Sequence, residues 1–293
     1  MPMNRFIILL AAVLMTACNP TAKLPNIQTQ ADAAFNQADY NKAYTLYKEY
    51  INVAKANQVN IDQALYVKQA QSCAQLNKID EASAIYDNLL TNDANIKYIS
   101  EYAQMLQSNG KVDEELSLWT KHKNKLKEAN LLKLSTERII SLNAAKSQHQ
   151  AVVDTYAEKG NVNLSKETQL TYIKALKALK KGHAAIKSCN LLLKEYPNYI
   201  GALEWKAKYY YDKAEKRYKY EMNKYNKKKN ATTYAYLRRD LKKISADFRI
   251  ARDTFIKLRK QDPKNKSYIK YLKNAYLRLE QKAEAAKMDK LLK

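Results

Sequence analysis

The chain has 293 residues, enough for a sizeable buried core, and 46% of them are hydrophobic, which argues against a disordered protein. Only four Gly and five Pro occur, too few for a turn-rich β-sandwich, so the composition favours an almost entirely helical protein. The net charge is +23, and residues 201–293 carry 28 basic against 11 acidic side chains. This excess suits nucleic acid, an anionic membrane surface, an acidic polymer or an acidic protein as a partner.

The N-terminal stretch MPMNRFIILLAAVLMTAC has the organisation of an export signal. Its apolar run, from Phe6 to Met15, is about ten residues long, too short to span a bilayer and typical of a signal peptide. The residues from Met15 to Cys18 resemble the lipobox of bacterial lipoproteins, with Met where Leu is usual. The resemblance implies removal of residues 1–17, acylation of Cys18 and tethering to a membrane by several acyl chains. The alternative is an ordinary cleaved signal followed by an incidental cysteine.

Residues 18–26 would then form a spacer next to the lipid. We therefore expect an exported lipoprotein, anchored at the outer membrane rather than the inner one. Export removes nucleic acid as a partner and leaves envelope proteins, anionic lipid and anionic glycan. Cys73 and Cys189 remain after processing, and we expect both to be small buried residues rather than a disulfide.

A short phrase recurs along the rest of the chain: a small residue, an aromatic residue four positions later, and often an apolar residue three beyond that. It begins at positions 43, 82, 115, 151, 185, 251 and 285, with intervals of 39, 33, 36, 34, 66 and 34 residues. The fullest copies are Ala43/Tyr47/Tyr50, Ala82/Tyr86/Leu89 and Ala251/Phe255/Leu258. The weaker copies are Glu115/Trp119, Ala151/Thr155, Ala185/Cys189/Leu192 and Ala285/Asp289/Leu292. A second set of small residues precedes the phrase, at Ala31, Ala70, Ala103 and Ala207.

A period near 34 residues with these offsets resembles the tetratricopeptide repeat (TPR). The resemblance implies two antiparallel helices per repeat, crossing where their small residues meet. Prolines close repeats in this family, and Pro197 and Pro263 each follow a key alanine by twelve residues. The sequence thus predicts an all-α, TPR-like right-handed α-solenoid of about seven helix pairs, from residue 27 to the end. The alternative is a helical bundle without repeats.

The interval of 66 residues indicates that the sixth pair, residues 200–263, is elongated into a protruding hairpin. Apolar residues recur at steps of four and three along both halves, as in the seam of an antiparallel two-helix coil. The turn is expected at NKKKNATT, residues 226–233, with Thr232 or Thr233 as the N-cap. Residues 27–199 would hold repeats one to five and residues 264–293 a capping repeat. This arrangement resembles TPR lipoproteins of Bacteroidota.

No catalytic constellation is recognisable in the sequence. The three histidines, His122, His149 and His183, fall in different repeats without metal-ligand spacing, and four glycines cannot build a phosphate-binding loop. Gly110 and Gly182 are expected in turns that need a positive φ. We therefore expect a non-enzyme without a cofactor or a metal.

The family binds ligands on a concave groove lined by the first helices of successive repeats. Amide side chains there suit a peptide backbone, and lysines suit acidic groups. Solubility alone also places Gln and Lys on exposed helix faces, and the two-lysine, two-asparagine clamp of chaperone-binding members is not reproduced. The family's register transfers to Asn36, Gln71, Gln75, Gln104, Gln107, Asn143, Lys174, Lys177, Lys208 and Tyr211.

The expected hairpin tip carries Lys227, Lys228 and Lys229, whose mutual repulsion folding does not explain. We interpret these lysines as contacts to an anionic partner, although a solvated face would also be rich in Lys and Tyr. The leading hypothesis is an envelope scaffold that captures a protein or peptide in its groove and uses the basic hairpin as a second contact. The alternative is binding of anionic lipid or glycan through the hairpin. The oligomeric state is left open.

Overall fold

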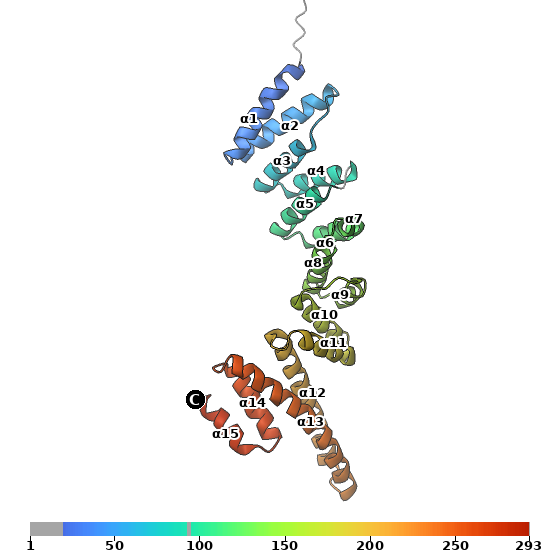
Figure 1. Ribbon diagram of the computed structural model, residues 1–293, viewed down its shortest axis with the longest axis vertical. Coiled ribbons are helices and arrows are strands. Elements are labelled where there is room, and N and C mark those ends of the chain that lie inside the picture. Colours follow the sequence, from blue (N-terminus) through green and yellow to red (C-terminus); the bar gives the residue numbers. More distant parts are fainter. Residues whose placement is uncertain (1–19, 93–94, 293) are drawn as a thin grey trace, which may run out of the picture. The chain divides into compact units, whose positions relative to one another are not determined.

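The computed structural model describes residues 20–92 and 95–292, and these residues form helices without any strand (Figure 1). They divide after Asn130 into two compact units, which are treated separately below. Cys18, the predicted processing and acylation site, lies outside the described residues. The expected class, an all-α solenoid of TPR-like helix pairs, is confirmed.

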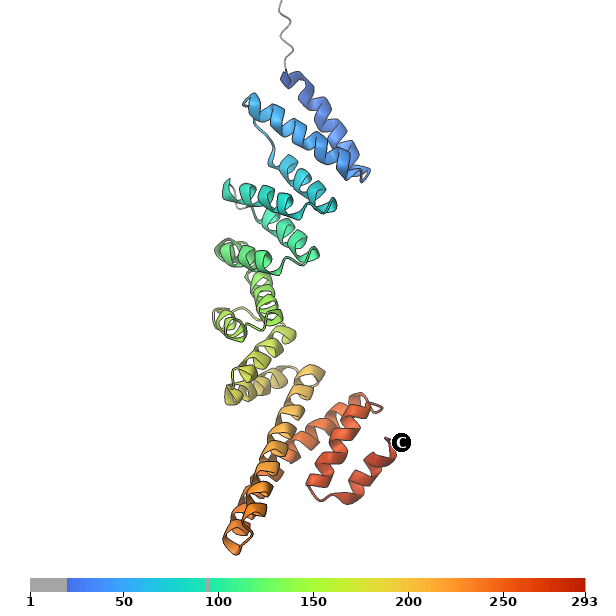
Figure 2. The same cartoon turned by 180° about the vertical axis from the view of Figure 1, so that it is seen from behind.

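The first unit contains three helix pairs in chain order (Figures 1 and 2). A short 3₁₀ turn at Pro20–Lys23 precedes the first pair, and the short helix α7 (Lys123–Glu128) follows the third. The three pairs are α1 (Leu24–Asn36) with α2 (Tyr40–Ala56), α3 (Gln63–Gln75) with α4 (Ile79–Asn92), and α5 (Ile96–Ser108) with α6 (Val112–Lys121).

The second unit contains four helix pairs, which complete the seven expected from the period. The third of its pairs is far longer than the others. The four pairs are α8 (Leu132–Ala145) with α9 (His149–Ala157), α10 (Lys166–Ala178) with α11 (Gly182–Glu195), α12 (Ile200–Lys227) with α13 (Ala231–Gln261), and α14 (Lys266–Arg278) with α15 (Lys282–Lys290).

Small residues occupy the buried crossings within the pairs. The first-helix alanines at 31, 70 and 207 and the second-helix alanines at 43, 82, 185 and 251 have no exposed surface. The aromatic residues four positions on, Tyr47, Tyr86 and Phe255, are at most 1% exposed. Cys73 and Cys189 are free thiols, fully buried as expected, and burial raises the pKa of each to about 11.

The third pair meets the same packing demand with different chemistry. Glu115 stands where the other repeats have alanine, yet it is only 1% exposed. Its carboxylate accepts a hydrogen bond from the indole nitrogen of Trp119, one turn later, at 3.0 Å. A buried polar group is tolerated when it is hydrogen-bonded, so this pair replaces the apolar contact by an internal polar one.

The turns within the six short pairs share one backbone conformation, a residue with φ near +60° just after the first helix, and the turn of the long pair does not have it. Glycine occupies this position only once, at Gly110 (φ +66°). The expectation for Gly182 was wrong, because it begins α11 and Lys180 takes the positive φ instead. A Cβ at Gly182 would lie 2.8 Å from the hydroxyl of Tyr209, so the close approach of that ring explains this glycine. The other pairs use Ala38, Asn77, Ser147 and Glu280 there.

The long hairpin turns over three residues, Lys228–Asn230, fewer than expected. Asn230, rather than Thr232 or Thr233, is the N-cap of α13. Its side chain accepts from the Thr233 backbone at 2.8 Å, and the Thr233 hydroxyl accepts from the Asn230 backbone at 3.1 Å. This reciprocal capping box explains why the turn closes so tightly despite its lysines.

The two long helices pack along the expected seam. Ala207, Ala214, Phe248, Ala251 and Phe255 are at most 1% exposed. In both views the end of the hairpin extends beyond α14 and α15 (Figures 1 and 2).

Ion pairs complete the hairpin, and sequence reasoning missed them. Asp247 on α13 lies 3.0 Å from the ammonium of Lys213, and Asp240 lies 3.4 Å from the guanidinium of Arg217. The two carboxylates are seven residues apart and therefore lie on the same face of α13, opposite the cations of α12.

A bidentate ion pair fixes the last repeat to the hairpin. The Arg278 guanidinium on α14 donates to both carboxylate oxygens of Glu215 on α12, at 2.9 and 2.7 Å. The same guanidinium lies 4.2 Å from the ring centre of Tyr218. The hydrogen bonds from Arg278 hold the pKa of Glu215 below its ordinary value of 4.5. An ion pair with two parallel hydrogen bonds is a stronger interaction than a surface ion pair with a single contact.

Replacing Asn230 by Ala should lower the free energy of unfolding by about 1 kcal/mol, because the capping box loses its acceptor. Thr232→Ala is the matched control, since Thr232 is exposed and caps nothing. Urea unfolding followed by circular dichroism measures both variants. Equal stability of the two variants would contradict the assigned cap.

Replacing Glu215 by Gln should lower the free energy of unfolding at neutral pH by about 1–2 kcal/mol. A depressed pKa in the folded state stabilises the protein above the unfolded value, and this contribution is lost as pH falls through the folded pKa. The wild type should therefore lose stability below pH 4.5 more steeply than Glu215→Gln. Urea unfolding over a pH series tests this, with Glu221→Gln on the same helix as the control. Parallel curves for wild type and Glu215→Gln would refute the assignment.

Candidate functional site

Three of the predicted groove residues line one pocket in the first unit. Gln71 and Gln75 on α3 and Gln104 on α5 face a space of about 460 Å³. Phe35 from α1 and Tyr40 from α2 contribute to its lining, with ring centres 5.8 Å apart in an edge-on contact. The transferred register thus brings together amides from two successive repeats.

The pocket contains one charged residue, Glu101 on α5, among the described residues that line it. The carboxylate oxygen Oε2 of Glu101 is buried and has no hydrogen-bond partner in the described part of the protein. A buried acceptor without a partner costs about 1–3 kcal/mol, more when it is charged. A ligand that donates a hydrogen bond or carries a positive charge would remove this cost.

Tyr86, from α4, also lines the pocket that contains Glu101. Burial raises the pKa of its phenol, and the neighbouring charge of Glu101 raises it further, whereas the side chain of Gln71 opposes this rise. The ring stacks on Tyr102 with centres 5.0 Å apart. Tyr86 is therefore a rigid, neutral phenol beside the carboxylate. Sequence reasoning missed Glu101 because it lies outside the transferred register.

Two further predicted residues of the first unit are exposed but do not line this pocket. Asn36 is the last residue of α1, and Gln107 lies near the end of α5. They remain predicted contacts at the edge of the same region.

The predicted residues of the second unit lie in varied environments. Asn143 is only 5% exposed, so it is a buried residue of α8 rather than an open contact. Tyr211 packs edge-on against Phe248 and Tyr271, with ring centres 5.7 and 4.9 Å away, and is partly buried. Lys174 is exposed on α10. These observations remove Asn143 from the groove and assign Tyr211 mainly to packing.

Lys177 and Lys208, from α10 and α12, both lie near Asp212. Burial raises the pKa of Asp212, and the two lysines oppose this by attracting its charge. The ammonium of Lys177 also lies 4.8 Å from the ring centre of Tyr209, and that of Lys208 lies 4.0 Å from Glu204. Both cations already have internal partners, so this region is less suited to an acidic ligand than the sequence suggested.

The end of the hairpin carries many cations without a partner. Lys227, Lys228 and Lys229 are exposed, and Tyr220, Tyr234 and Tyr236 near them are about half exposed, at 64, 51 and 49%. Cations there without an ion pair to any described residue are Lys216, Lys224, Lys227, Lys228, Lys229, Arg238, Lys242 and Lys243.

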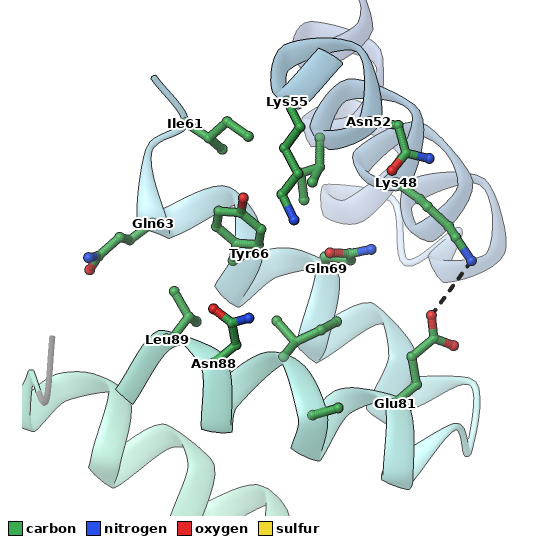
Figure 3. Close-up of a pocket in the computed structure, with 13 residues that line it drawn as sticks. Lys48, Asn52, Lys55, Ile61, Gln63, Tyr66, Gln69, Glu81, Asn88 and Leu89 are labelled. Atoms are coloured by element: carbon green, nitrogen blue, oxygen red, sulfur yellow. Dashed lines mark ion pairs between the residues drawn. The ribbon is translucent and has the colours of Figure 1, made fainter. Parts of the chain in front are cut away.

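A second pocket in the first unit, of about 450 Å³, lies among α2, α3 and α4 (Figure 3). Its lining comes largely from the second helices α2 and α4, and none of the predicted groove residues is part of it. Lys48 closes one side through an ion pair with Glu81 at 3.8 Å.

Within the described ranges no three His, Cys, Asp or Glu side chains are grouped as metal ligands would be. None of the helices in those ranges is both long and apolar enough to cross a membrane.

Comparison with known proteins shows the fold. The C-terminal part of a TPR repeat-containing protein from Cytophaga hutchinsonii is similar over 91% of this chain and 93% of that one, at 16% identity and a TM-score of 0.53. A tetratricopeptide repeat protein from Parabacteroides merdae covers 87% of this chain and 99% of its own, at 15% identity and a TM-score of 0.41. No protein-family model and no curated protein matches the chain. The first likeness supports a TPR-type fold and nothing beyond it, and the second adds no weight.

Proposed function

We propose that the chain is a non-catalytic scaffold of the cell envelope that binds a protein or peptide partner on the first-helix face of its first unit. The observation that carries the proposal is the pocket in which Gln71, Gln75 and Gln104 meet the partnerless carboxylate oxygen of Glu101.

The pocket has the chemistry of a peptide site. Amide side chains both donate and accept hydrogen bonds, so they match the alternating groups of an extended backbone. The single carboxylate adds selectivity, because it favours a segment that presents an ammonium or guanidinium group beside it. Phe35 and Tyr40 offer apolar surface for a neighbouring side chain. The partner is therefore an extended segment with at least one basic residue.

The envelope location rests on the N-terminal sequence. The apolar run and Cys18 support export, acylation and an outer-membrane anchor in this proposal. An anchored scaffold does not diffuse away from its membrane, so it would hold its partner near that surface.

A second candidate function is binding of anionic lipid or glycan by the end of the hairpin. The unpaired cations there favour it, since neutralising them against an anionic surface requires no internal ion pair to break. Half-exposed tyrosines beside them suit an interface that is apolar on one side and wet on the other.

Replacing Glu101 by Gln tests whether the partner binds in the groove. Loss of one charge-assisted hydrogen bond should weaken partner binding about tenfold or more. Stability should stay the same or rise, because the substitution removes a buried charge that lacks a partner. A photo-crosslinking residue at position 75 or 104 should capture the same partner in cells, and one at exposed position 41 on α2 should not. Equal capture at all three positions, or unchanged affinity of Glu101→Gln for the captured partner, would reject the groove.

Charge reversal at the tip tests the second candidate. Replacing Lys227, Lys228 and Lys229 by Glu should reduce binding to vesicles containing anionic phospholipid at least a hundredfold. Each lysine contributes about 1 kcal/mol to this binding, and each new glutamate adds repulsion. Vesicle co-sedimentation at two salt concentrations measures this, and binding should weaken with salt. Reversal at Lys257, Lys264 and Lys270, exposed lysines away from the tip, is the control. An equal loss in both triple variants would mean that net charge alone is responsible.

A further inference from the structure

The pocket among α2, α3 and α4 is lined by both polar and apolar side chains (Figure 3). Lys55 reaches in from α2, Asn88 and Leu89 from α4, and Tyr66 and Gln69 lie between them, whereas Gln63 points away. Ile51, Ile61 and Ile85 add aliphatic walls. The pocket shares no lining residue with the Glu101 pocket, so it is a separate site.

Gln69 is the first unusual feature. Only 7% of this residue is exposed, yet its amide makes no hydrogen bond to any described residue. The amide atoms of Gln69 are not among the fully buried polar atoms that lack a partner, so they reach the open space of the pocket. The part of Gln69 that is not covered by protein lines the pocket, so a ligand there would meet this amide.

The second feature is an uncompensated positive charge. Lys48 is paired with Glu81 and donates to the hydroxyl of Tyr44 at 2.9 Å, so its charge is already balanced. Lys55 pairs with no carboxylate in the described part of the chain, and its ammonium lies 5.4 Å from the ring centre of Tyr66. The pocket therefore offers a cation, an amide donor on a largely buried residue and aliphatic walls together.

We propose that this pocket binds a carboxylate joined to an aliphatic group, with Lys55 as its counter-ion and Gln69 as a hydrogen-bond donor. The aliphatic group packs against Ile51, Ile85 and Leu89, and the carboxylate lies between Lys55 and Gln69. The C-terminal residue of a peptide and a free aliphatic acid share this chemistry. The proposal does not depend on the proposed function.

A sugar fits the pocket less well. Sugars bind by stacking on an open aromatic face, and the only aromatic ring among the lining residues, Tyr66, has Lys55 over it. An ammonium ligand is also disfavoured, because Lys55 would repel it and Glu81 is already engaged by Lys48.

Calorimetric titration of the full chain in detergent tests the proposal with two matched probes, N-acetyl-leucine and N-acetyl-leucinamide. The acid should bind at least tenfold more tightly than the amide. Lys55→Met should remove this difference, and Gln69→Leu should weaken binding of the acid about fivefold or more. Lys42→Met, an exposed lysine of the same helix, should bind like the wild type. Glu101→Gln should also leave this binding unchanged, which separates the site from the proposed peptide pocket.

Two further probes identify the source of the carboxylate. Acetyl-Gly-Gly-Leu with a free C-terminus should bind more tightly than octanoate if the pocket takes the end of a peptide, and octanoate should equal or exceed it if the pocket takes a free acid. Equal affinity for N-acetyl-leucine and its amide, no binding of either at millimolar concentration, or an unchanged preference in Lys55→Met would overturn the proposal.

Discussion

Close approach of paired helices at methyl-sized side chains is the constraint on which the structure depends. Ala31 and Ala43 belong to one buried core cluster in the first pair, and Ala70 and Ala82 recur in the second pair, all without exposed surface. The distance between packed helices is set by the side chains at their contact, so a larger residue would force the axes apart and strain the core by about 1–3 kcal/mol. The pair with Glu115 shows that side-chain volume is not the only property that decides which residue fits at this buried contact. A longer side chain is accepted there because its carboxylate is hydrogen-bonded internally.

Since the buried faces determine the pairing, the remaining faces of each helix are free to carry binding groups. Helix α3 serves two pockets at once. Gln69 lines the pocket of Figure 3, and Gln71, two residues later, lines the Glu101 pocket. Two residues along an α-helix correspond to a rotation of about 200°, so neighbouring glutamines face nearly opposite directions. A single thirteen-residue helix thereby separates a site with an unpaired carboxylate from one with an unpaired ammonium.

The period of small and aromatic residues was enough to predict seven helix pairs and a long sixth one, because burial at fixed intervals is a property of the chain itself. The roles of single residues were harder to predict from the sequence. Asn143 matches the groove register but is buried, since register gives the side of a helix and not what covers it. Thr232 and Thr233 have good capping chemistry, yet the cap is Asn230, because a turn can close in several registers with similar local preference. Glu101 became recognisable only through a missing hydrogen-bond partner, and Gln69 only through its place in a pocket, and both depend on residues distant in the sequence.

The hairpin changes character along its length. Ala214, Ile244 and Phe248 are almost fully buried, whereas no residue of the hairpin between Ala214 and Leu237 is buried. In that outer part the ring centres of Tyr225 and Tyr234 lie 6.0 Å apart. Few apolar atoms leave water there, so the distal turns can separate without disturbing the base. The hairpin is then a stiff stem with a compliant end, able to conform to an uneven surface at small energetic expense.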